Sequence, residues 1–254
     1  LLHRYARLRK KLLGVDALHF YDIYAQLVKE DVQAIPFAQA RETVCVALAP
    51  LGDKYGKILR AGFDDRWIDI YQNEGKRSGA YSAGTMVHPF VLLNYNGTLD
   101  SQFTLAHETG HALHSYLSNQ NQPYVYHDYV IFVAEVASTC NEALLMEHLL
   151  QSTKERKMRL RLINHFLEQF KSTLYRQTMF AEFELKIAEL SAQGTPLTAE
   201  TLCSVYQKLN ALYFGDVIEV DDQIALEWAR IPHFYYNYYV FQYATGYAAA
   251  IALS

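Results

Sequence analysis

The amino-acid sequence predicts a mainly α-helical domain with one small β-sheet, and three observations lead to this prediction. Apolar residues recur at helical spacing through most of the 254 residues. Capping residues and breaks, such as the Gly-Thr-Pro sequence at 194–196, divide this pattern into separate helices. Only the stretch from 75 to 97 has a different pattern, because glycines interrupt short apolar runs there and an Asn-Gly turn signal closes it.

Three helical regions are expected before the sheet. Residues 1–30 carry apolar and aromatic side chains at helical spacing. Pro36 suits the first turn of a second helix that runs through Leu48, and a short third helix covers residues 54–59. The small sheet is then expected around a strand at residues 90–93.

Four helices are expected after the sheet. Asp100 is a good N-cap for the first of them, and Thr198 caps the last, which ends near Gly215. The small apolar residues at 248–254 are typical of an unfinished helix. The expected ranges of the four helices are 103–117, 130–150, 154–190 and 198–215.

Composition and charge argue against several kinds of partner and site. The net charge is −4 and no basic stripe is visible, so nucleic acid is not an expected partner. The three cysteines, Cys45, Cys140 and Cys203, lie far apart and form no CxxC pair, which argues against a disulfide framework or a cysteine zinc site. No apolar run reaches membrane-spanning length and no signal-peptide layout is visible, so a cytoplasmic protein without a membrane partner is expected.

The sequence His107-Glu108-Thr109-Gly110-His111 is an HExxH motif within a predicted helix. Residues i and i+4 lie one above the other on a helix, so the two imidazoles can bind one zinc ion. Glu108 is placed to take a proton from a water molecule at the metal, whose pKa zinc lowers to about 7. The motif therefore predicts a catalytic zinc site with His107 and His111 as ligands and Glu108 as general base.

A catalytic zinc ion needs a third protein ligand, and Glu135 is the expected one. It is the one acidic residue in the apolar stretch 132–139, where an unpaired carboxylate is costly. A helix salt bridge is the alternative, but no Lys or Arg occurs at residues 78–153. Glu142, two turns further on, can accept a hydrogen bond from a ligand histidine. His114 also tends toward the metal face and is the alternative ligand, although a core or supporting role is favoured.

These residues resemble the oligoendopeptidase F family, relatives of thimet oligopeptidase. The resemblance rests on the HExxH motif, on Ala-Glu-Val-Ala-Ser-Thr at 134–139, and on the stretches 75–82, 121–126 and 239–246. It covers the whole chain, which corresponds to the C-terminal, catalytic part of a longer protein. It implies a zincin-like helical metallopeptidase domain with a small β-sheet beside the HExxH helix. Residues 1–254 are accordingly expected to be a single catalytic domain and a fragment of a longer peptidase.

The resemblance also implies the chemistry. One Zn²⁺ ion would be bound by His107, His111 and Glu135, with Glu108 as the general base of a metalloendopeptidase. Its substrates would be oligopeptides, cleaved at internal bonds. An edge strand would pair with the substrate backbone, since an open strand edge offers unpaired amide groups. The expected substrate-binding residues are Gly79, Ala80 and Tyr81.

An aromatic run near the C-terminal end contains candidate oxyanion donors. Hydrolysis through a tetrahedral intermediate needs hydrogen-bond donors at the developing negative charge, and the family uses a histidine and tyrosines of this region. His233 and Tyr239 are the first candidates, followed by Tyr235 and Tyr238. The alternative is an aromatic core helix with surface hydroxyls. Phe241 stands where relatives often have tyrosine, so one expected donor is missing or replaced by a neighbour.

Two other function classes remain open from the sequence. A peptide-binding domain without turnover is one, although the base and the ligands are all present. An exopeptidase of similar fold is the other, and it requires a clamp for a terminal charge, for which Arg77 is the nearby basic candidate. The sequence makes no prediction of oligomeric state.

Overall fold

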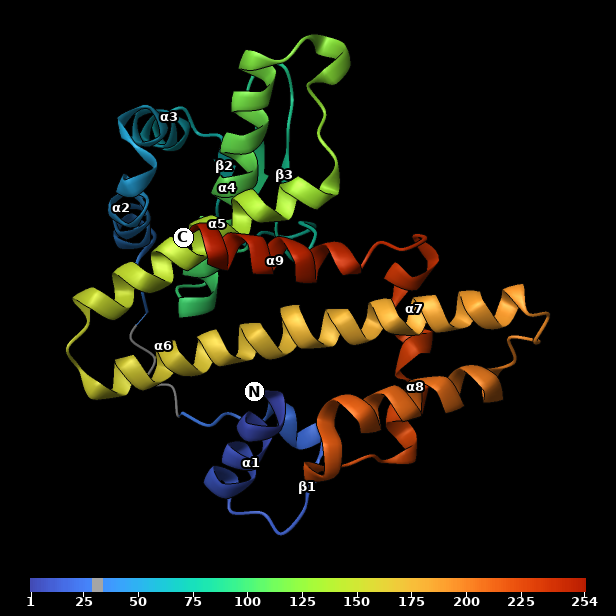
Figure 1. Ribbon diagram of the computed structural model, residues 1–254. Coiled ribbons are helices and arrows are strands. Elements are labelled where there is room, and N and C mark those ends of the chain that lie inside the picture. The colour runs from blue at the N-terminus through green and yellow to red at the C-terminus, as the bar shows by residue number, and fades with distance from the viewer. Residues whose placement is uncertain (29–33) are drawn as a thin grey trace. The chain divides into compact units, whose positions relative to one another are not determined.

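The computed structural model describes residues 1–28 and 34–254 (Figure 1), and the chain divides into two compact units. Unit 1 comprises Leu1–Lys29 and Ile163–Thr245, and unit 2 comprises Glu30–Leu162 and Gly246–Ser254. Both consist mainly of helices with short strands between them, which confirms the predicted fold class. The single catalytic domain stays a prediction.

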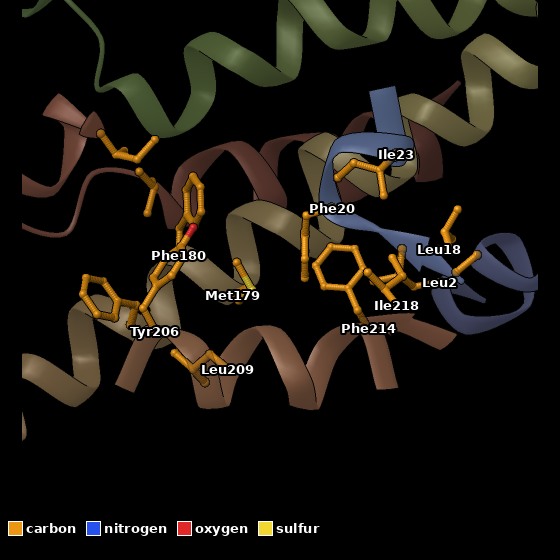
Figure 2. Close-up of a cluster of buried hydrophobic side chains, with 14 residues drawn as sticks. Leu2, Leu18, Phe20, Ile23, Met179, Phe180, Tyr206, Leu209, Phe214 and Ile218 are labelled. Carbon is orange, nitrogen blue, oxygen red and sulfur yellow. The ribbon is translucent and has the colours of Figure 1, made fainter. Parts of the chain in front are cut away.

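Unit 1 contains helices and a two-stranded parallel sheet in which Leu18 pairs with Ile218. Its core is a cluster of buried apolar side chains (Figure 2). Within it, the rings of Phe20 and Phe214 meet edge to face with centroids 5.0 Å apart. Each buried side chain of this size contributes about 1.5–3 kcal/mol to folding, so the cluster is a main source of stability for unit 1. The elements of this unit are α1 (Leu2–Leu13), β1 (Leu18–His19), η1 (Phe20–Tyr24), η4 (Phe170–Tyr175), α7 (Arg176–Ala192), α8 (Ala199–Phe214), η5 (Gly215–Val217), β5 (Ile218–Glu219), η6 (Asp222–Arg230) and η7 (Pro232–Tyr235).

Helical spacing over residues 1–30 predicted more helix than forms. α1 ends because Gly14 adopts a left-handed conformation (φ 69°) and donates its N–H to the carbonyl of Lys10. Beyond it, the backbone N–H of His19 donates to the Asp22 carboxylate at 2.9 Å and begins a 3₁₀ turn. Of the apolar residues expected in helix there, Phe20, Ile23 and Tyr24 belong to η1, and Leu27 lies in no helix. Residues 29 and 30 lie outside the described residues.

The long helix predicted over 154–190 forms, with one change in its hydrogen-bond pattern. α6 (Arg156–Gln169) and α7 are joined by η4, a π-helical segment. The buried Lys171 of η4 donates to the carbonyl of Ile23 at 3.1 Å, so the segment holds an ammonium group against η1. Neither this helix nor any other in the described residues has an apolar stretch that could span a lipid bilayer.

Unit 2 contains helices and a three-stranded sheet in the order β2 (Ile68–Asp69), β4 (Phe90–Leu92) and β3 (Tyr81–Ala83). β3 pairs antiparallel with β4, with Ser82 opposite Val91, and lies at one edge of the described sheet. β3 and β4 contact α4, so the sheet lies beside the HExxH helix as predicted. The helices expected after Pro36 and over 54–59 form as α2 and α3. The elements are α2 (Phe37–Ala47), η2 (Ala49–Leu51), α3 (Asp53–Asp64), β2 (Ile68–Asp69), β3 (Tyr81–Ala83), β4 (Phe90–Leu92), α4 (Leu99–Asn121), η3 (Tyr124–Tyr126) and α5 (Ile131–Ser152), and α9 (Phe241–Leu253) runs from unit 1 into unit 2.

Two helix starts test the capping predictions. Thr198 caps α8 as predicted, since its hydroxyl oxygen accepts the N–H of Thr201 at 3.2 Å. The prediction of Asp100 as the cap of α4 is wrong, because Thr98 occupies that position and accepts the N–H of Ser101 at 3.1 Å. Asp100 lies in the first turn instead, where its negative charge interacts favourably with the helix dipole.

Candidate metal centre

α4 and α5 make an extensive contact within unit 2 (Figure 1), and a glycine of the HExxH motif allows it. A Cβ atom on Gly110 would lie 2.6 Å from the Cα of Ser138 and 2.9 Å from the carbonyl oxygen of Ala137. Since both neighbours are backbone atoms, only glycine fits without a shift of one helix. This close approach brings a carboxylate of α5 to the histidines of α4.

His107, His111 and Glu135 form one group of potential metal ligands, with one ligand atom from each within 4.8 Å of the others. The two Nε2 atoms of the histidines are 3.2 Å apart. Glu135 Oε2 lies 3.6 Å from Nε2 of His107 and 3.8 Å from Nε2 of His111. All three side chains are largely buried, so their polar atoms converge away from bulk solvent.

These separations match those of a tetrahedral zinc site. Ligand atoms about 2.1 Å from a tetrahedral ion lie roughly 3.4 Å from one another, and the observed spacings of 3.2, 3.6 and 3.8 Å lie close to that value. Two imidazoles and one carboxylate are a common donor set for catalytic zinc. The residues present therefore fit a zinc ion with three protein ligands.

Glu142 orients one of the histidines. Its Oε1 atom accepts a hydrogen bond from Nδ1 of His107 at 2.5 Å. A carboxylate on the far ring nitrogen fixes the tautomer and leaves Nε2 free to bind a metal. The seven-residue spacing from Glu135 to Glu142 lets one helix, α5, supply both carboxylates.

Further contacts around the ligands were not predicted from the sequence. The Ser138 hydroxyl donates to Glu135 Oε2 at 3.2 Å, and Asn141 donates through Nδ2 to the carbonyl of Ala106 at 3.1 Å. A Cβ on Gly246 would lie 3.1 Å from Cβ of Glu135, so α9 also packs on that ligand. Ser138 and Asn141 are fully buried polar residues of α5, and their position three and six residues after Glu135 is the signal that could have identified them.

The site carries an excess of negative charge. Burial raises the pKa of Glu108 to about 7 and also raises that of Glu135. Burial lowers the pKa of His107, but the hydrogen bond and charge of Glu142 outweigh it and raise the pKa to about 9. The pKa of His111 falls to about 3 because of burial and of the neighbouring His107 charge. A bound cation stabilises buried carboxylates of this kind, which agrees with the donor geometry.

His114 takes a place outside the ligand group of the described residues. Its ring stacks on that of Tyr129, with centroids 3.7 Å apart and an interplanar angle of 16°. The Tyr129 hydroxyl hydrogen-bonds to the Ser115 hydroxyl at 2.7 Å and donates to the carbonyl of His111 at 3.4 Å. Burial lowers the pKa of His114, so this ring is a neutral packing element beside the potential ligands.

The predicted substrate-binding residues lie at and just before the edge strand β3. Gly79 adopts a positive φ of 88°, and its carbonyl accepts a hydrogen bond from Asn94 at 2.8 Å. Ala80 precedes the strand and the half-exposed Tyr81 begins it. At the other end, a Cβ on Gly84 would lie 2.8 Å from the Ser115 hydroxyl of α4. The edge strand thus ends against the helix that carries His107 and His111.

Comparison with known proteins decides the family. The model of peptidase family M3 matches residues 1–254. The chain belongs to peptidase family M3. It is 53% identical over 255 residues to Oligopeptidase PepF of Bacillus subtilis, covering 100% of this chain and 38% of that protein. It is 50% identical over 251 residues to the chromosomal Oligoendopeptidase F of Lactococcus lactis subsp. cremoris, covering 98% of this chain and 42% of that protein.

A solved structure of an oligoendopeptidase has a similar fold. Oligoendopeptidase-F from Enterococcus faecium aligns with a TM-score of 0.72 and 41% identity, covering 99% of this chain and 38% of that one. The predicted resemblance to the oligoendopeptidase F family is therefore confirmed. The chain spans about two fifths of the length of the curated relatives it matches.

In this M3 chain, unit 1 carries a cluster of aromatic rings around His233. The rings of His233 and Tyr239 stack with centroids 5.6 Å apart, and Tyr236 and Tyr243 approach the histidine edge to face at 5.7 and 6.2 Å. The Tyr243 hydroxyl donates to the Tyr239 hydroxyl at 3.4 Å. The two first candidates from the sequence are thus in contact, together with two tyrosines that were not selected.

The other two tyrosines that were selected from the sequence are more exposed to solvent. Tyr235 is 79% exposed and Tyr238 is 45% exposed. Tyr243 was missed because it lies beyond the aromatic run at 233–239, within α9, and its position four residues after Tyr239 is the signal that could have identified it. Phe241, which lacks a hydroxyl, is also exposed and begins α9.

Proposed function

We propose that this chain holds the zinc ion and the general base of a metalloendopeptidase that hydrolyses internal bonds of short peptides. One observation carries the proposal: three potential ligands, His107, His111 and Glu135, converge at tetrahedral spacing with the Glu108 carboxylate on the same helix as both histidines. Membership of peptidase family M3 supports peptide hydrolysis, and the names of two relatives, Oligopeptidase PepF and Oligoendopeptidase F, support short peptides as substrates.

His107, His111 and Glu135 would hold the ion, and Glu142 would keep the His107 ring in the required orientation. The zinc ion, when bound, supplies Lewis acidity that polarises the scissile carbonyl and acidifies the attacking water. The remaining chemistry belongs to side chains of this chain, beginning with the base.

Glu108 acts as the general base in this proposal. Its Oε2 atom is buried and has no hydrogen-bond partner among the described residues, so it is available to accept a proton. Burial raises its pKa to about 7, which suits a group that must both take a proton from water and give it up. Glu108 would take the proton of the attacking water and later deliver it to the leaving amine.

The peptide and the oxyanion would be held by residues outside the ligand set. The β3 edge, with Gly79, Ala80 and Tyr81 at its beginning, would pair with the substrate backbone. Hydrogen-bond donors to the oxyanion would come from His233 and Tyr239, and then from Tyr235 and Tyr238. The contacts between the rings of His233 and Tyr239 support their assignment as one group of donors. A cytoplasmic location stays part of the proposal.

The test compares the wild type with Glu108→Gln in zinc content and in cleavage of an internally quenched peptide. We expect both proteins to bind one zinc ion per chain and Glu108→Gln to lose nearly all cleavage, because an amide cannot accept the proton. Glu147→Gln, a change at an exposed carboxylate of α5, is the matched control and should cleave like the wild type.

Each alternative function gives a different result. Cleavage by Glu108→Gln at the wild-type rate contradicts the role of the base. A wild type that binds zinc but does not cleave supports peptide binding without turnover. Refusal of end-blocked peptides, combined with cleavage of free ones, supports an exopeptidase.

A further inference from the structure

The segment that links η7 to α9 has an unusual backbone. Asn237 and Tyr238 adopt φ angles of 53° and 59°, so two consecutive residues that are not glycine lie in the left-handed region. Residues with a Cβ rarely adopt this conformation, and a consecutive pair persists only where surrounding structure imposes it. Some group must therefore hold residues 236–240, which we call the Tyr238 loop, in this conformation.

Glu184 of α7 is that group. Its Oε1 atom accepts a hydrogen bond from the backbone N–H of Tyr238 at 3.0 Å. The side chain is 5% exposed, and its Oε2 atom is buried with no hydrogen-bond partner among the described residues. Burial raises the pKa of Glu184, and the backbone amides of Tyr238 and Val240 act in the opposite direction, that of Tyr238 through its hydrogen bond to Oε1. The hydrogen bond to Tyr238 therefore ties a buried carboxylate of α7 directly to the second of the two left-handed residues.

Apolar side chains hold the chain on both sides of the loop. Phe180 and Phe183, four and one residues before Glu184, lie 5.2 and 5.1 Å from the ring of Phe234 in η7. Val240, at the end of the loop, is buried in the core of unit 1. Because the flanks are already anchored by apolar contacts, the buried carboxylate serves a separate purpose, which is to set the conformation of the turn between them.

The turn matters because of what it joins. His233 precedes it and Tyr239 lies within it, and their rings stack on each other. A change in the two left-handed residues would rotate the chain just before Tyr239 and so move its hydroxyl relative to the histidine. Strained backbone at a residue other than glycine is a feature that concentrates at functional sites.

We propose that Glu184 is a positioning residue: its buried carboxylate holds the Tyr238 loop in the left-handed conformation and thereby sets the geometry of the His233 and Tyr239 donors. It touches neither substrate nor metal in this account. The proposal rests on the proposed function in so far as those donors serve peptide hydrolysis, whereas the hold on the loop is a property of unit 1 that can be measured without turnover.

The experiment uses the full 254-residue chain and three variants. Glu184→Ala removes the acceptor, and Glu184→Gln keeps an oxygen that can accept the Tyr238 N–H. Glu182→Ala is the matched control, since this residue lies on the same helix and instead accepts a hydrogen bond from the Tyr213 hydroxyl at 3.0 Å. The first measurement is amide hydrogen exchange by NMR at Tyr238 and Val240, with α7 amides as the internal reference.

We expect Glu184→Ala to accelerate exchange at Tyr238 and Val240 by about tenfold or more while α7 amides stay protected. Glu184→Gln should recover most of the protection, and Glu182→Ala should leave the loop unchanged. If exchange at Tyr238 and Val240 is unchanged in Glu184→Ala, Glu184 does not hold the Tyr238 loop, whether or not the chain cleaves peptides. A general loss of protection that includes α7 identifies a purely structural role and also contradicts the proposal.

The second measurement is the kinetics of zinc-loaded protein with the quenched peptide. We expect Glu184→Ala to lower kcat roughly tenfold to a hundredfold with zinc content and KM unchanged, because misplaced donors affect the transition state more than binding. Glu184→Gln should restore most of kcat. A wild type that binds zinc without cleaving the peptide contradicts the proposed function. In that case the hydrogen-exchange result alone tests whether Glu184 holds the Tyr238 loop in its conformation. Wild-type kcat in Glu184→Ala, or an equal loss in Glu182→Ala, contradicts the positioning role.

Discussion

The metal centre of unit 2 and the aromatic cluster of unit 1 are built in different ways. In the proposed metal centre, the HExxH spacing places His107 and His111 on one face of α4, and two helices in close contact bring Glu135 to them. In the aromatic cluster, the side chains come from a 3₁₀ turn, an irregular loop and the start of α9. Regular helices let sequence spacing determine side-chain geometry, whereas the loop depends on a distant residue, Glu184.

Removing a ligand is expected to have the largest effect. Glu135→Ala deletes one of three groups that converge on the metal position, so zinc affinity should fall by more than the ~10–100-fold that loss of an outer hydrogen-bond partner causes. Zinc binding can be measured by competition with a chelating dye. Glu147→Ala, an exposed change on the same helix, should bind zinc like the wild type, and equal affinity of the two variants would remove Glu135 from the ligand set.

A smaller loss is expected from Glu142→Gln. The amide cannot reproduce the charged hydrogen bond to Nδ1 of His107, so zinc affinity should fall about 10–100-fold while the fold is kept. The measurement is again chelator competition, with circular dichroism to check helical content. If Glu142→Gln binds zinc as tightly as the wild type, the orientation of the His107 ring does not depend on this carboxylate.

The close contact of the two helices can be tested through Gly110→Ala. The added Cβ would meet backbone atoms of Ser138 and Ala137, so we expect a loss of about 1–3 kcal/mol in the free energy of unfolding, measured in urea. Gly56→Ala in α3 is the control, because nothing lies within 4 Å of a Cβ there, and it should gain about 0.5–1 kcal/mol. Equal effects of the two changes would show that α4 and α5 can separate without cost.

In unit 1, a buried carboxylate is balanced by protein cations. Glu227 accepts hydrogen bonds from Arg176 and from the Tyr206 hydroxyl, both at 2.6 Å. Burial raises its pKa, but the hydrogen bond and charge of Arg176 outweigh this and leave the pKa below the usual value. Its contribution to stability is therefore present above the unfolded-state pKa of about 4.3 and is lost as pH falls through the lower folded-state pKa.

Glu227→Gln should accordingly be less stable than the wild type at neutral pH, and the difference should shrink as pH falls below about 4. Urea unfolding at a series of pH values measures it. Glu189→Gln, at a half-exposed pair with Lys186, is the control and should show little dependence of this kind. A difference that stays constant from neutral to acidic pH would contradict the charge pairing at Glu227.

The contrast between regular helices and an irregular loop also explains which features could be predicted from the sequence. The ligand spacing, the family blocks and most helix ranges follow from local patterns, because a helix converts residue spacing directly into geometry. The cap at Thr98 was missed because Asp100 is an equally good capping residue by type, and only the backbone hydrogen bond distinguishes them. The left-handed pair at 237–238 was missed because neither residue is glycine and its cause, Glu184, lies over fifty positions away.

The zinc assignment is tested most directly by the X-ray absorption spectrum of the chain loaded with zinc, together with the zinc content per chain. His107, His111 and Glu135 should bind one ion, so the spectrum should report two imidazole ligands and oxygen, without sulfur, and should change in Glu135→Ala. A zinc content far below one ion per chain, or a spectrum that is identical in the wild type and in Glu135→Ala, would contradict the assignment of these three residues as the metal site.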